Sequence, residues 1–269
     1  YMMKKIKKVG RRAAWTMVNQ MSKGRFEPYD FEMKLPPIVL DLGEYGTIEL
    51  TGQIDRVDIL DENEKTYVKI IDYKSREKKF SLSDAYNGLD IQLIVYLESV
   101  LEHLPSLKKT KAYPAGAFYF PIVDKLIESD LTDVEEIEKQ IAGKLKMQGI
   151  VLKDINIIKA IDADIENEGS VIDVRVKDED IKSENALSEE EFTALLEHVM
   201  ELVKDMSKEI LAGNISIHPY SDKQKAQCSY CEYSSMCKFD TLFEGNTHKT
   251  VKALKDKEVK ELLMKKEGI

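Results

Sequence analysis

Two aspartates and one lysine lie within apolar, β-rich segments of the chain. Asp55 belongs to the run GQIDRVD at residues 52–58, and Asp72 and Lys74 belong to the run IIDYKS at residues 70–75. Polar side chains in such strands cost free energy unless they are paired or bind a ligand. Because residues two apart on a strand share a face, Asp72 and Lys74 should point the same way. These three residues are therefore the first candidates for chemistry.

A hairpin places Asp55 beside Asp72. The charged segment 61–65 has the composition of a turn, and a turn centred between Asn63 and Glu64 makes Asp55 face Asp72 across adjacent strands. Two carboxylates so placed can share a Mg²⁺ ion, which prefers oxygen ligands. Lys74 can then orient water or stabilise charge on a phosphate. The alternative is a buried Asp–Lys ion pair, with Asp55 at a turn or a sheet edge.

Four further polar side chains flank these residues. Asp58 is expected at the surface or in support of the metal ligands, and Arg56, which alternates to the opposite face from Asp55, is expected to be structural. Gln92 and Tyr96 lie four residues apart, so they share one face of a predicted helix. That face either packs and meets solvent, or lies over the carboxylates or a nucleic-acid strand.

The elements that position these residues follow from hydrophobic periodicity. Helices are predicted at residues 3–22, 89–101 (ending at Pro105), 133–147, 188–211 and 251–264. Strands are predicted at residues 31–35, 38–42, 46–60, 68–73, 113–122 and 170–176, and residues 150–162 are either a short helix or extended. Ser188 and Glu191 have the spacing of a capping box.

This order of elements predicts an α/β fold with a mixed central sheet flanked by helices. We expect residues 1–213 to form a core that begins with a basic helix. Residues 214–269 are expected to form a cysteine-containing tail that packs on the core.

Charge is distributed unevenly along the chain. The net charge is −9, but residues 1–26 carry eight basic side chains and no acidic one, which leaves 32 basic and 49 acidic side chains in the remainder. This asymmetry indicates a local phosphate-facing surface, and a solvated helix face is the alternative. Trp15 on this helix is expected to be a packing residue. No signal peptide or membrane-spanning run is found, so a cytoplasmic location is expected.

Three cysteines lie close together near the C-terminus. Cys228, Cys231 and Cys237 have the spacing C-x2-C-x5-C. A clustered, odd set is typical of a metal or iron–sulfur centre rather than of a disulfide framework. Both kinds of centre normally take four protein ligands, so the set is incomplete.

Taken in order, these runs resemble a known family. GQID, DYK and QLIVY resemble the GxxD, DYK and QxxxY signatures of RecB-type nucleases, which belong to the PD-(D/E)xK superfamily with a restriction-endonuclease-like core. The run YPAGAFYF at residues 113–120, the segment HPY at residues 218–220 and the cysteine spacing followed by Asp240 resemble the C-terminal nuclease region of the AddB/RexB family. The resemblance covers nearly the whole chain.

The resemblance implies a role for each matching residue. Asp55, Asp72 and the carbonyl of Tyr73 would bind Mg²⁺ or Mn²⁺, Lys74 would be the catalytic lysine, and Gln92 and Tyr96 would be the helix motif beside them. Many RecB-type sites also have a histidine ligand on an upstream helix, but residues 1–35 contain none; Glu32 or Glu49 could replace it.

The resemblance also implies an activity and partners. The chain would be a DNA exonuclease domain that acts on single-stranded or resected DNA during recombinational repair of double-strand ends. An AddA-type subunit would supply the helicase motor, because no Walker-type sequence is present here. A catalytically silent DNA-binding or scaffold module and a stand-alone CRISPR-associated nuclease are the alternatives.

The resemblance further implies a 4Fe–4S cluster held by Cys228, Cys231, Cys237 and a fourth cysteine far upstream, which this sequence lacks. We therefore expect a fragment of a larger protein, with the cluster absent or labile. Zinc held with His218 is an alternative.

Overall fold

The fold was obtained as a computed structural model that describes residues 2–35, 37–125, 133–166, 171–221, 228 and 231–266. Its helices and strands run in the following order: α1 (Met2–Ser22), β1 (Glu27–Lys34), β2 (Ile38–Asp41), β3 (Thr47–Leu50), β4 (Gln53–Glu62), β5 (Lys65–Lys74), α2 (Leu82–Tyr86), α3 (Gln92–Lys108), β6 (Lys111–Pro121), α4 (Val134–Gly143), β7 (Gln148–Leu152), α5 (Ile155–Ile161), β8 (Val176–Lys177), β9 (Asp180–Ile181), β10 (Ala186–Leu187), α6 (Glu189–Leu211), β11 (Tyr220–Ser221), α7 (Ser234–Cys237), β12 (Lys249–Thr250) and α8 (Asp256–Lys266).

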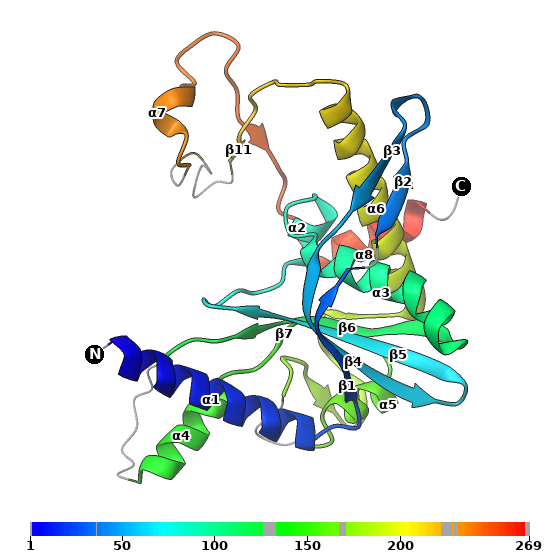
Figure 1. Ribbon diagram of the computed structural model, residues 1–269, viewed down its shortest axis with the longest axis vertical. Helices are drawn as coiled ribbons and strands as arrows, with labels where there is room; N and C mark the ends of the chain where they lie inside the picture. The colour runs from blue at the N-terminus through cyan, green and yellow to red at the C-terminus, as the bar shows by residue number, and fades with distance from the viewer. Residues whose placement is uncertain are drawn as a thin grey trace.

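A six-stranded mixed sheet forms the centre, in the order β1-β4-β5-β6-β7-β10. The β5–β6 and β7–β10 pairs are parallel, and the other three pairs are antiparallel. Helices α1, α4 and α5 lie on one side of the sheet, whereas α2, α3, α6 and α8 lie on the other (Figure 1). The predicted α/β fold with a mixed sheet between helices is confirmed.

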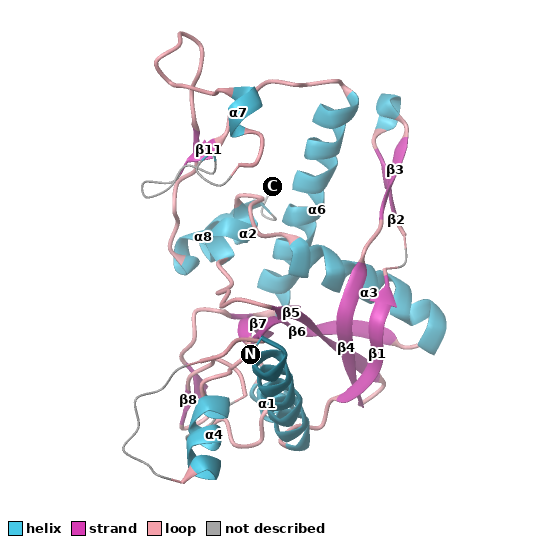
Figure 2. Cartoon of the chain, turned by 60° about the vertical axis from the view of Figure 1, so that its left-hand side comes forward, coloured by secondary structure: helices cyan, strands magenta, loops and turns pink. Residues whose placement is uncertain are grey.

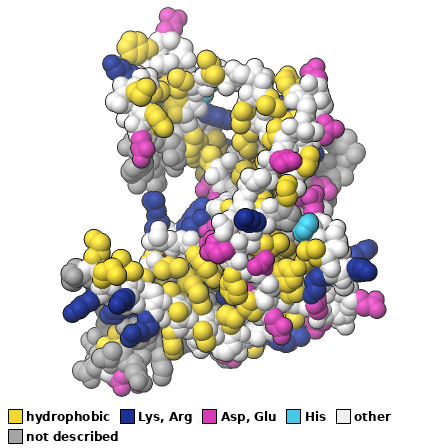
Figure 3. All heavy atoms as spheres, viewed as in Figure 1, with side chains coloured by type: hydrophobic (Ala, Val, Ile, Leu, Met, Phe, Trp, Pro, Cys, Tyr) yellow, Lys and Arg dark blue, Asp and Glu magenta, His cyan; other side chains and the backbone are white. Residues whose placement is uncertain are grey.

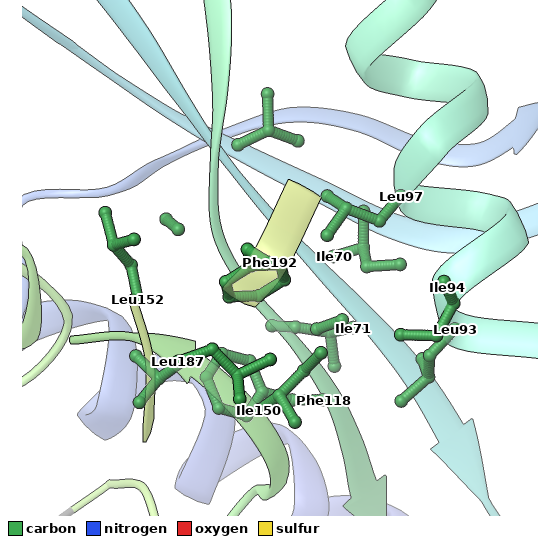
Figure 4. Packing of buried hydrophobic residues seen from close by; sticks show 14 of the residues in the cluster. Ile70, Ile71, Leu93, Ile94, Leu97, Phe118, Ile150, Leu152, Leu187 and Phe192 are labelled. Carbon is green, nitrogen blue, oxygen red and sulfur yellow. The ribbon is translucent and has the colours of Figure 1, made fainter. Parts of the chain in front are cut away.

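The core lies where α3 and α6 cover the middle strands. Ile70 of β5, Leu97 of α3, Phe118 of β6 and Phe192 of α6 are each at most 1% exposed and lie within one hydrophobic cluster (Figure 4). Strands β6 and β7 approach closely at Gly149, where a Cβ atom would lie 1.9 Å from the carbonyl oxygen of Ala117. Glycine is therefore required at that position.

Several predicted boundaries are wrong for identifiable reasons. The strand expected over residues 46–60 is two strands, because β3 ends at Leu50 and pairs with β2 as a separate hairpin. Helix α3 continues past Pro105 to Lys108, since a proline removes one backbone donor without stopping a helix whose last turn is held by the buried Leu104.

The chain after the core also differs from expectation. Of the strand predicted at residues 170–176, the described part makes only a bridge at Ile172 and the start of β8 at Val176. Helix α4 ends at Gly143, and α8 begins at Asp256, later than the predicted residue 251. The short helix α2, capped by the Ser81 side chain, was missed because five residues show no periodicity.

Helix α6 is the last helix of the predicted core, and α8 is the last helix of the predicted tail. Helix α6 begins with the predicted capping box of Ser188 and Glu191. Helix α8 packs against α2 and α6 with Val259 and Leu263 buried, and α7 and β11 lie beyond the end of α6, away from the central sheet (Figure 2). Among the helices that are described, none is both long and apolar enough to cross a membrane.

Candidate active site

The β4–β5 hairpin has the register that the sequence predicts. Arg56 pairs with Ile71, and no bulge interrupts the ladder from there to the turn. Asp55 and Asp72 occupy the next positions, on the same face as each other. One carboxylate oxygen of Asp55 accepts a hydrogen bond from the backbone N–H of Tyr73 at 2.6 Å. The hairpin therefore brings Asp55 to β5 and fixes its carboxylate beside Asp72.

Asp72 is the most constrained group of the site. Its side chain is only 6% exposed, and its Oδ2 forms an ion pair with the Lys74 ammonium at 2.5 Å. Beyond this contact, the buried Oδ2 has no partner within the described chain. Burial raises the pKa of Asp72, and the Lys74 ammonium opposes that rise. A buried carboxylate with a single cationic neighbour still has oxygen lone pairs without a partner, and a bound divalent cation would occupy them.

A chain of hydrogen bonds connects the lysine to helix α3. Lys74 Nζ donates to Gln92 Oε1 at 3.0 Å, and Gln92 Nε2 donates to the Tyr96 hydroxyl at 3.1 Å. The ring of Tyr96 lies over Gly52, where a Cβ atom would come within 3.2 Å of the ring. The first residue of the GxxD run is thus a glycine because Tyr96 packs on it, and the structure brings the three sequence motifs together.

A second network beside the lysine was not foreseen. Tyr119 is the register partner of Asp72 on β6, and its hydroxyl donates to Asp90 Oδ1 at 2.6 Å. Lys78 Nζ donates to the same Asp90 oxygen at 2.8 Å and to the Tyr119 hydroxyl at 3.0 Å. The Tyr119 ring centroid lies 5.2 Å from the Lys74 ammonium and 4.3 Å from that of Lys78.

This network surrounds a buried phenol. Burial and the neighbouring Asp90 carboxylate raise the pKa of Tyr119, so the phenol stays protonated and can donate. Lys78 lies four residues after Lys74, and Asp90 lies two residues before Gln92. This closeness to the motifs is the signal in the sequence that could have identified both residues.

The opposite face of the same strands carries a buried cluster of charges. Arg56 makes two hydrogen bonds to Asp58, at 2.6 and 2.7 Å, and Lys69 Nζ lies 2.9 Å from Asp58. The structural role expected of Arg56 fits this pairing. The expectation of a surface position for Asp58 is wrong: the residue is 0% exposed, and the Phe31 and Phe26 rings lie over its partners Arg56 and Lys69. Tyr73 also directs its ring to this side, edge-on to Phe120 at 6.0 Å.

No third acidic or histidine ligand joins the two carboxylates within the part of the chain that the structure describes. Glu32 is bonded to the Gln53 amide at 2.8 Å, and Glu49 is exposed on the β2–β3 hairpin. Neither residue is brought into a group of three with Asp55 and Asp72.

The three cysteines are free thiols in the structure. Cys231 and Cys237 are exposed and Cys228 is half-buried. The described residues around them contain no group of three or more side chains that could hold a metal ion.

The mixed sheet and this site define a class of protein. A carboxylate pair at a strand end, a lysine two residues further on, and a glutamine–tyrosine helix over them are the features of a nuclease core. The family model for the PD-(D/E)XK nuclease superfamily matches residues 1–238, and the chain belongs to that superfamily.

Curated relatives at moderate identity share one description. Proteins named as a subunit of an ATP-dependent helicase/deoxyribonuclease from Alkaliphilus oremlandii (strain OhILAs) and Alkaliphilus metalliredigens (strain QYMF) are each 44% identical to this chain, over 98% of it and 24% of the relative. The protein of the same name from Clostridium kluyveri (strain NBRC 12016) is 38% identical over 95% of this chain and 23% of the relative. The chain therefore spans about a quarter of the length of these relatives.

Proposed function

We propose that this chain is a Mg²⁺- or Mn²⁺-dependent deoxyribonuclease domain that hydrolyses single-stranded DNA as an exonuclease. The observation that carries the proposal is the buried carboxylate of Asp72 beside Asp55, whose Oδ2 has the Lys74 ammonium as its one partner among the described residues. Two carboxylates and a backbone carbonyl form the kind of oxygen set that Mg²⁺ prefers. Asp55, Asp72 and the Tyr73 carbonyl would hold the ion.

Each side chain then has a defined task. A bound divalent ion would polarise the phosphodiester and lower the pKa of water. Asp55 stays in place because the Tyr73 N–H holds one of its oxygens. Lys74 carries positive charge toward the phosphate, where it stabilises the negative charge that develops as water adds to phosphorus and the leaving oxygen departs.

The helix above the site controls the position of the lysine. Gln92 accepts from Lys74 and donates to Tyr96, so the lysine is held on two sides, by Asp72 and by Gln92. A lysine held this way does not need to reorganise during the reaction. We therefore assign Gln92 and Tyr96 as positioning residues.

The names of the relatives support the assignment of this domain to a larger helicase–nuclease complex. We propose that this domain belongs to a bacterial, cytoplasmic helicase–nuclease that resects double-strand DNA ends for recombinational repair, with an AddA-type subunit as the motor. The name that the relatives share combines ATP-dependent helicase and deoxyribonuclease. We further propose that residues 1–213 form the nuclease core and residues 214–269 the cysteine-bearing tail.

The cysteines fit a cluster only in part. Three thiols at C-x2-C-x5-C are present, no fourth cysteine exists in the sequence, and two of the three are exposed. We propose that Cys228, Cys231 and Cys237 supply three ligands of a 4Fe–4S cluster in the full-length protein and that this chain alone holds none or a labile one. A full complement of iron in an anaerobic preparation of this chain would contradict the second part.

The deciding experiment compares wild type, Asp72→Ala and Asp205→Ala on a labelled single-stranded oligonucleotide with Mg²⁺ or Mn²⁺. Asp205 is an exposed aspartate on α6 and serves as the matched control. We expect Asp72→Ala to lose at least about 100-fold in cleavage rate, and Asp205→Ala to match wild type. Mn²⁺ titration calorimetry should show binding that Asp72→Ala abolishes. Equal cleavage in wild type and Asp72→Ala would disprove the site.

A measurement of metal binding distinguishes the nuclease from the alternative of a catalytically silent scaffold. A silent nuclease-fold scaffold would bind DNA without binding Mn²⁺ at Asp72. The presence of Asp55, Asp72 and Lys74 in one connected arrangement favours the enzyme.

A further inference from the structure

Helix α1 presents an unusual surface. The first 26 residues hold eight basic side chains and no acidic one. Positions 4, 7, 11 and 15 lie three or four residues apart, so Lys4, Lys7, Arg11 and Trp15 share one face of the helix. We name this set the α1 stripe. At about 1.5 Å per residue it extends over roughly 16 Å.

The α1 stripe faces solvent because the other side of the helix is buried. Arg12, Ala13 and Thr16 are the buried residues of α1. Lys4, Lys7 and Arg11 are exposed, and within the described residues they make no ion pair. Trp15 is 46% exposed, so the expectation that it packs is wrong.

A series of contacts brings the helix to the edge of the sheet where the site lies. Arg12 and Lys5 both pair with Asp124, at 3.1 and 3.7 Å. Asp124 follows the end of β6, where Pro121 is the register partner of Lys74. The next residue, Ile122, donates its N–H to the Lys74 carbonyl at 2.8 Å. The N-terminal half of α1 therefore lies near the strand end that carries Lys74.

Basic side chains are also exposed on the segments between α1 and the candidate site. The loop after β5 exposes Arg76 and Lys79, and its Glu77 pairs with Lys125 at 3.3 Å. Lys and Arg side chains gather over α1 and along the border of the hollow between the core and the cysteine-bearing segment (Figure 3). Arg76 and Lys79 thus add exposed basic side chains between α1 and the candidate site, beside the paired acids Glu77 and Asp124.

We propose that the α1 stripe binds single-stranded DNA, with Lys4, Lys7 and Arg11 on successive phosphates and Trp15 stacked on a base. The proposal rests on the proposed function and extends it to a substrate-holding surface outside the catalytic residues. Proteins that bind single-stranded DNA without sequence preference use basic side chains along the phosphate backbone and aromatic rings on which the bases stack.

Charge complementarity makes a polyanion the occupant to which the proposal commits, and the exposed Trp15 beside the cations favours a single strand of DNA. The chain outside residues 1–26 has 32 basic and 49 acidic side chains. Its net negative charge repels a polyanion, whereas α1 attracts one.

Trp15 is the sole tryptophan, so its fluorescence reports on the surface directly. The protein carries Asp72→Ala and is kept in EDTA, which prevents cleavage, and it is titrated with an unlabelled single-stranded oligonucleotide. We expect quenching that saturates with the same Kd as anisotropy of a labelled oligonucleotide. Trp15→Ala should weaken binding about ten-fold by anisotropy, within what stacking on one aromatic ring contributes.

A charge-matched pair of variants tests the phosphate contacts. One combines Lys4→Ala, Lys7→Ala and Arg11→Ala; the control combines Lys252→Ala, Lys257→Ala and Lys265→Ala, which removes three exposed lysines far along the chain. The slope of log Kd against log salt should fall by about 2 in the first variant, at about 0.7 per phosphate contact on single strands. The control should keep the slope of wild type. Circular dichroism checks that α1 remains helical in both.

Two results would overturn the inference. One is unquenched Trp15 fluorescence at saturating oligonucleotide; the other is an equal salt slope in the two triple variants. If single-strand cleavage still depends on Asp72 in either case, the nuclease proposal stands, and a protein partner becomes the occupant of the α1 stripe.

Discussion

Helix α3 carries a carboxylate whose ionisation opposes folding. Glu98 is half-buried on the same helix as Gln92 and Tyr96. Burial, followed by repulsion from Glu102 and Glu197, raises the pKa of Glu98 from 4.5 to about 7. That difference corresponds to about 3 kcal/mol, at about 1.4 kcal/mol per pKa unit. Partial exposure to solvent reduces the expected effect to about 2 kcal/mol.

The sign follows from linkage between proton binding and folding. The folded state holds the Glu98 proton more tightly than the unfolded state, because its pKa is raised. The favourable contribution is therefore complete below about pH 4.5 and is lost as pH rises through about 7. Glu98→Gln keeps the shape of the protonated side chain and removes the ionisation. We expect the variant to be more stable than wild type by about 2 kcal/mol at pH 8 and by only about 0.5 kcal/mol at pH 5.

Urea unfolding at pH 5, 6, 7 and 8, followed by far-ultraviolet circular dichroism, measures this difference. Glu102→Gln is the matched control, since Glu102 lies on the same helix but is exposed. A gap between Glu98→Gln and wild type that stays constant from pH 5 to pH 8 would refute the reasoning, as would an equally large pH-dependent gap for Glu102→Gln.

Three further substitutions test the packing behind the site. Gly52→Ala puts a methyl group 3.2 Å from the Tyr96 ring. We expect a several-fold lower kcat on single-stranded DNA with an unchanged melting temperature. The reason is that a displacement of a positioning side chain by about 1 Å can lower the rate about 100-fold. Gly149→Ala forces a Cβ atom against a backbone carbonyl, and thermal melting should show a loss of at least about 3 kcal/mol. Asp58→Ala leaves Arg56 buried without its partner, and urea unfolding should show a loss of about 3–5 kcal/mol; a loss below about 1 kcal/mol would contradict the buried cluster.

Much of the site followed from strand geometry alone. Period two placed Asp72 and Lys74 on one face, and the turn at residues 61–65 fixed the register that the structure shows. The link from Lys74 to Gln92 did not follow, because it depends on how α3 crosses the sheet. That crossing is set by the packing of Leu93 and Leu97, which the sequence marks only as one apolar face.

The two wrong predictions, for Asp58 and Trp15, concern which side of a strand or helix is buried by the rest of the protein. Alternation predicted that Arg56 and Asp55 lie on opposite faces, but a strand in the middle of a sheet is covered on both, so Asp58, which shares the face of Arg56, is buried with Lys69. Trp15, alone on the basic helix, was expected to pack rather than to stack on a base. On α1 the buried positions are taken by Arg12, Ala13 and Thr16, and Trp15 points away from them.

The two faces of the hairpin have different tasks, and each depends on the other. Asp58 and Lys69 are register partners across β4 and β5, and their ion pair is fully buried. If one strand slipped by one residue, its charge would turn toward the opposite face of the sheet and the pair would be separated, at a cost of several kcal/mol. The same slip would move Asp55 away from the Tyr73 N–H that holds it. We infer that the buried ion pair on the closed face disfavours slipped registers and so helps to hold the register on which the open face depends.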